Sequence, residues 1–98
     1  MDKEPTQEEV RSTIMQLSQL LDLVGLEAYI EKRTDWGRRP GVEPWQYTRA
    51  ALAEYAPGTD PEQVIQLFQG VGVGSDVEAL RWILKHDRFV LIWLYVWL

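Results

Sequence analysis

The sequence lacks cysteine altogether and has a single histidine, His86. Without thiols there is no disulfide, zinc ribbon, iron–sulfur ligation or thiol catalysis, and one histidine rules out a metal site built on a histidine pair. Nucleotide-binding, kinase and serine-hydrolase signatures are missing as well. We therefore predict that the chain is not an enzyme and that it holds no metal and no cofactor.

Long hydrophobic runs are also missing. No stretch reaches the roughly 18 apolar residues of a membrane-spanning helix, and the polar residues 1–5 do not resemble a secretory signal. A chain of 98 residues that is 46% hydrophobic suffices for one packed core and is too short for two. We expect a single helical domain over residues 1–98, located in the cytoplasm.

Basic residues are few and unevenly placed. Ten lysines and arginines stand against 15 acidic residues, which gives a net charge of −5. Residues 50–80 contain five acidic residues and no basic one, whereas residues 32–49 sum to +3 and residues 81–98 to +2. The overall charge disfavours nucleic acid as a partner, because most of the surface repels phosphate.

The first basic segment is a loop rich in turn-forming residues, with Arg33, Trp36, Arg38 and Arg39 as a possible contact site for an anionic partner. Arginine and tryptophan are enriched at binding hot spots, and guanidinium groups bind carboxylate or phosphate in a bidentate manner. The simpler interpretation is a solvated loop anchored by its tryptophan. We keep both interpretations.

The second basic segment contains Arg81, Lys85 and Arg88, spaced four and three residues apart, as a possible basic helix face. Such a face is typical of a solvated helix and, beside Trp82, also fits contact with a membrane surface. A helix-turn-helix is a further alternative, with residues 61–69 as its first helix and Asp76 and Glu78 as an unfavourably acidic start of its second.

Three segments carry the pattern of a helix start, in which an N-cap residue stands three positions before Glu or Gln. They begin at Thr6, Asp60 and Ser75. Together with apolar residues at helical spacing, they predict an all-α fold, a small bundle of four to five helices. The helices are expected over residues 7–24, 26–32, from about 44 to before 57, over 61–69 and from 77 to 98, with Gly25 ending the first.

The first of these helices has one apolar face, formed by Val10, Ile14, Leu17, Leu21 and Val24. Their alternating spacing of four and three is typical of a helix that packs on a core. A dimeric coiled coil is the alternative, although the repeat covers barely two heptads.

The last ten residues, 89–98, carry no charged side chain. Burying them fully is worth about 15–25 kcal/mol before the entropy of ordering is subtracted. We predict a very apolar continuation of the last helix; a strand that pairs with another chain is the alternative. The predicted interface residues are Phe89, Leu91, Ile92, Trp93, Leu94, Tyr95, Trp97 and Leu98.

These patterns favour a small helical protein-interaction module, such as a regulator, adaptor or assembly subunit, that buries its apolar C-terminal segment in a homo-oligomer or in a protein partner. A peripheral membrane protein attached through the same segment is the first alternative. A nucleic-acid-binding module of helix-turn-helix type is the second.

Overall fold

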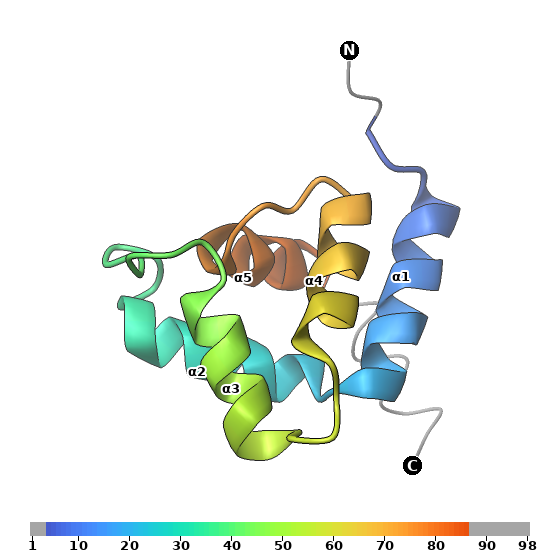
Figure 1. Cartoon of the computed structure of the whole chain (residues 1–98). Coiled ribbons are helices and arrows are strands. Elements are labelled where there is room, and N and C mark those ends of the chain that lie inside the picture. The colour runs from blue at the N-terminus through green and yellow to red at the C-terminus, as the bar shows by residue number, and fades with distance from the viewer. Residues whose placement is uncertain (1–3, 87–98) are drawn as a thin grey trace.

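The computed structural model describes residues 4–86, and these residues form five helices without any strand (Figure 1). The prediction of an all-α bundle of four to five helices is confirmed for this part of the chain. The apolar segment 89–98 lies outside the described residues, so its helical form stays a prediction. The helices are α1 (Gln7–Leu20), α2 (Leu23–Thr34), α3 (Gln46–Tyr55), α4 (Pro61–Gly70) and α5 (Asp76–Lys85).

The three predicted helix starts are confirmed. The hydroxyls of Thr6 and Ser75 each accept a hydrogen bond from the amide three residues further on, at 3.1 and 3.2 Å, and the Asp60 carboxylate accepts one from the amide two residues further on, at 3.0 Å. In the last of these starts, the carboxylate of Glu78 accepts a hydrogen bond from the Gly74 amide, not from the amide of the cap residue itself. Local side-chain chemistry therefore sets where these three helices begin.

The predicted end of the first helix at Gly25 was wrong. Leu21 is extended, with φ −158° and ψ 167°, and Gly25 lies inside α2. The break turns the chain so that Leu23, which is 2% exposed, also reaches the core, whereas Val24 stays 38% exposed. In one continuous helix Leu23 would lie about 100° away from Val24 and off the predicted apolar face, whereas the break at Leu21 lets it reach the core.

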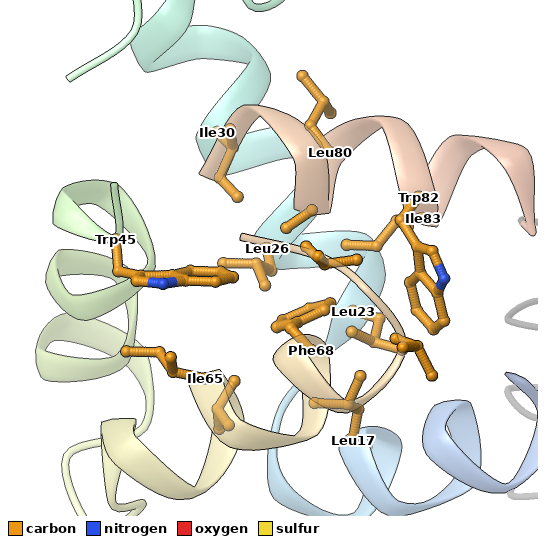
Figure 2. Close-up of a cluster of buried hydrophobic side chains, with 14 of the residues drawn as sticks. Leu17, Leu23, Leu26, Ile30, Trp45, Ile65, Phe68, Leu80, Trp82 and Ile83 are labelled. Atoms are coloured by element: carbon orange, nitrogen blue, oxygen red, sulfur yellow. The ribbon is translucent and has the colours of Figure 1, made fainter. Parts of the chain in front are cut away.

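The core lies where all five helices meet. The helix α1 packs beside α4, and α2 makes its most extensive contacts with α5 and also packs on α3. Phe68 is fully buried at the centre, where its ring stacks on Trp45 and meets the edge of Trp82, with both centroid distances at 5.8 Å (Figure 2). Offset or edge-on aromatic pairs of this kind add to the energy of area burial.

A buried carboxylate joins the start of α5 to the start of α3. Asp76 is 2% exposed, and its oxygens accept hydrogen bonds from the amides of Tyr47 and Thr48 at 2.9 and 2.8 Å and from the Thr48 hydroxyl at 2.6 Å. Its own amide donates to the carbonyl of Pro44 at 2.6 Å. Trp45, the N-cap residue of α3, has no capping side chain, so α3 takes its cap from a residue about thirty positions later.

Candidate functional site

A groove of about 660 Å³ opens between α2, α3 and the end of α1. Leu26, Ala51 and Leu52, all buried, form part of its lining and belong to the core beneath it. Most of its lining is apolar, as in sites that take hydrophobic side chains or ligands. The other apolar residues that line it are Leu20, Leu21, Ala28, Tyr29, Tyr55 and Ala56.

Two tyrosines facing one another form part of the groove wall. The rings of Tyr29 and Tyr55 meet edge to face with centroids 6.1 Å apart, and Tyr55 is 72% exposed. The guanidinium of Arg33 lies 4.5 Å from the centre of the Tyr29 ring, a cation–π contact. Lys32 and Asp22 also line the groove, so the groove combines an apolar surface with two cations from the last turn of α2 and one acidic side chain at its start.

Tyr55 and Arg33 in the groove both have raised pKa values. The charge of Glu54 and its hydrogen bond raise the pKa of Tyr55 above its usual range, with smaller contributions from burial and from Tyr29. Hydrogen bonding to Tyr29, together with its charge, raises the pKa of Arg33. At neutral pH the groove therefore presents the neutral phenol of Tyr55 and the permanent cation of Arg33.

The predicted basic loop is divided by the fold. Arg33 belongs to the groove, whereas Trp36, Arg38 and Arg39 are exposed in the loop between α2 and α3. Trp36 is 62% exposed. The interpretation of this tryptophan as the anchor of the loop was therefore wrong.

Two residues of the predicted basic face of α5, Arg81 and Lys85, are exposed one turn apart. The guanidinium of Arg81 lies 4.0 Å from the position that a Cβ of Gly37 would occupy, so Arg81 adjoins the basic loop. Lys85 is farther along the helix and lines a hollow with Trp82 and His86. Arg88, like the predicted interface residues of the segment 89–98, lies outside the described residues.

The hollow at the end of α5 has a volume of about 370 Å³. Among residues 4–86, the Trp82 indole nitrogen is the one buried side-chain polar atom without a hydrogen-bond partner. Burial lowers the pKa of His86, whose ring lies 5.2 Å from that of Trp82, and the charge of Lys85 lowers it further. Near neutral pH this histidine is therefore mainly uncharged.

The helices α4 and α5, which we considered as a helix-turn-helix, are joined by the glycine-containing segment 71–75. The first turn of α5 points to the start of α3, because Asp76 binds the α3 amides there. One face of α5 lies against the core, with Ala79, Leu80, Trp82 and Ile83 all buried. Arg81 and Lys85 are exposed.

The groove and the proximity of Arg81 to the loop were not predicted from the sequence, because both arise from contacts between distant segments.

Within residues 4–86 there is no group of three or more histidine, cysteine or acidic side chains arranged to hold a metal, and no helix there is long and apolar enough to cross a membrane. The chain matches no protein-family model, no curated protein and no solved structure.

Proposed function

We propose that this chain is a small protein-interaction module, a regulator, adaptor or assembly subunit, that docks through apolar surface onto a protein partner. The observation that carries the proposal is the groove of about 660 Å³ between α2 and α3, whose lining is mostly apolar. An open apolar surface of this kind on a small domain is typical of an interaction site.

The occupant that fits the groove best is the charge-free segment 89–98, supplied by a second copy of the chain. Its aromatic and aliphatic side chains match the apolar lining, and each one that is buried fully is worth about 1.5–3 kcal/mol. Exchange of such segments between two copies gives a symmetric dimer, the commonest form of self-association.

A second copy fits better than the same chain because of where α5 ends. The hollow lined by His86 also includes Val10 on α1, whereas the groove begins at Leu20, about 15 Å further along that helix. The described part of α5 therefore ends beside the opposite end of α1 from the groove, which supports a segment supplied by a second copy.

The test compares two glutamates introduced at exposed helical alanines in the full-length chain. Ala28 lines the groove on α2, whereas Ala53 on α3 is exposed and lies outside it. Light scattering over a range of concentrations should find a dimer for the wild type and for Ala53→Glu, and a monomer for Ala28→Glu, because the longer side chain takes up groove volume that the apolar segment would fill and places a polar group against it. Trp93→Glu, on the other side of the proposed contact, should have the same effect as Ala28→Glu.

Two results would refute the proposal. One is a wild type that stays monomeric at all concentrations while Trp93 and Trp97 are shielded from a fluorescence quencher, which would place the apolar segment in the chain's own core. The other is binding to lipid vesicles through residues 89–98 in place of dimerisation, which would indicate membrane attachment.

A further inference from the structure

Trp36 combines two properties that stability does not explain. Its backbone is left-handed, with φ 59°, directly after Asp35 with φ 49°, and a bulky residue in this region is an unfavourable exception. Its side chain is nevertheless 62% exposed, so little packing offsets the strain. Glycine or asparagine would suit this backbone better.

The loop is held firmly in this conformation. The hydroxyl of Thr34, which is fully buried, donates to the Ile30 carbonyl at 2.6 Å and accepts from the Gly37 amide at 3.0 Å. The amide of Trp36 donates to the Glu31 carbonyl at 3.0 Å. A side chain displayed from a fixed loop loses little conformational entropy when it binds a partner.

Three arginines surround this loop. Arg38 and Arg39 follow Trp36 in sequence and are exposed, and the Arg81 guanidinium adjoins Gly37 from α5. Arg38 has only a marginal, exposed ion pair with Asp35, at 4.0 Å, which contributes little to stability. With Asp35 counted against the three arginines, this surface carries a formal charge of +2 on a chain whose net charge is −5.

We propose that Trp36, Arg38, Arg39 and Arg81 form a second binding surface, which we name the Trp36 surface, and that it takes a short acidic peptide segment of a protein partner. Arginines bind carboxylates in a bidentate manner, and an exposed tryptophan beside them provides the apolar anchor typical of a binding hot spot. Nucleic acid fits less well, since tight binders neutralise many phosphates and the rest of this chain repels them. A membrane fits less well, because attachment needs a broad apolar face.

The Trp36 surface is separate from the α2–α3 groove, so the inference does not depend on the proposed dimer. The full-length chain labelled with ¹⁵N has five tryptophan indole signals, and the one missing in Trp36→Asn identifies Trp36. The probe is a short synthetic peptide of glutamate and leucine, titrated at low ionic strength. An oligothymidine and phosphatidylserine vesicles are titrated in parallel.

The acidic peptide should shift the Trp36 signal in a saturable manner. The affinity for the peptide should fall as salt is added. Arg81→Ala and Arg39→Ala should each weaken the affinity about tenfold, and Trp36→Asn should abolish binding while the protein keeps its thermal stability. Lys85→Ala is the matched control, because it removes the same charge from the same helix away from the loop, and it should change the affinity less than about twofold.

Three outcomes would overturn the inference. The first is an acidic peptide that leaves the Trp36 signal in place or that binds equally well to Arg81→Ala and the wild type. The second is tighter binding of oligothymidine with a steep salt dependence, which would assign the surface to nucleic acid. The third is tighter binding of the vesicles, which would assign it to a membrane.

Discussion

Tryptophan is buried in the aromatic core around Phe68 and exposed on the Trp36 surface. Trp45 and Trp82 are at most 8% exposed and contact Phe68 on either side, whereas Trp36 is 62% exposed on a left-handed backbone. Packing energy explains the positions of Trp45 and Trp82. At Trp36 the left-handed backbone has a conformational cost that little packing offsets. Burial and backbone geometry, not residue type, therefore separate the two tryptophans that stabilise this core from Trp36, whose side chain is exposed.

The largest effect is expected at the centre of the aromatic core. Phe68→Ala should lower the free energy of unfolding by about 3–5 kcal/mol, because it removes a fully buried ring and leaves a cavity between two tryptophans. Trp36→Asn should not lower it, because asparagine suits the left-handed backbone better and little packing is lost. Urea unfolding followed by circular dichroism measures the free energy of unfolding of both variants. Equal losses would contradict the difference drawn between the buried core and the exposed Trp36.

The next largest effect concerns the buried carboxylate that caps α3. Asp76→Ala should cost about 2–4 kcal/mol, because two amides and a hydroxyl lose a charged acceptor inside the protein. Asp76→Asn keeps one acceptor oxygen and should cost less. If urea unfolding finds the two variants equal, the charge and not the hydrogen-bond geometry is what matters.

A smaller effect is expected in the support of the exposed loop. Thr34→Val keeps the shape of the side chain and removes both hydrogen bonds of its hydroxyl, which should cost about 1–2 kcal/mol. The variant should also broaden the Trp36 indole signal, since the loop is no longer held in one conformation. An unchanged signal would mean that the left-handed backbone is stable without Thr34.

The smallest effect concerns pH and His86, beside Trp82. Because burial lowers its pKa in the folded protein, the unfolded chain binds the proton first as the pH falls, and stability decreases from about pH 7 downward through the ordinary histidine range. His86 is partly exposed, so the loss should stay below about 0.5 kcal/mol. Comparing wild type with His86→Gln between pH 7.5 and 5.5 checks this, and a steeper dependence in the variant would contradict it.

The fold was predictable wherever short-range chemistry decides it. The caps at Thr6, Asp60 and Ser75 lie next to the amides they bind, so the start of each helix can be read from adjacent residues. The end of α1 was not predictable in the same way. Its break at Leu21 is stabilised by burial of Leu23 against other helices, and Gly25 is a misleading signal when seen alone.

The candidate sites were predictable only in part. The basic loop and the basic helix stood out as separate charge clusters, but no pattern indicates that Arg81 lies beside Gly37 or that Arg33 stacks on Tyr29. The groove depends on the angle between α2 and α3, which is set by the whole core. Asp76 had the sequence signature of an ordinary first-turn acid, and its partners are about thirty residues away.

The cap that Asp76 supplies to α3 has a consequence for how the protein is made. A nascent chain that has emerged from the ribosome only as far as Gly74 contains four of the five described helices, yet it lacks both the acceptor for the Tyr47 and Thr48 amides and the helix on which α2 packs most extensively. The core described here is therefore completed only after α5 has been synthesised. A chain that stops before α5 leaves the α2 residues that pack on α5 uncovered.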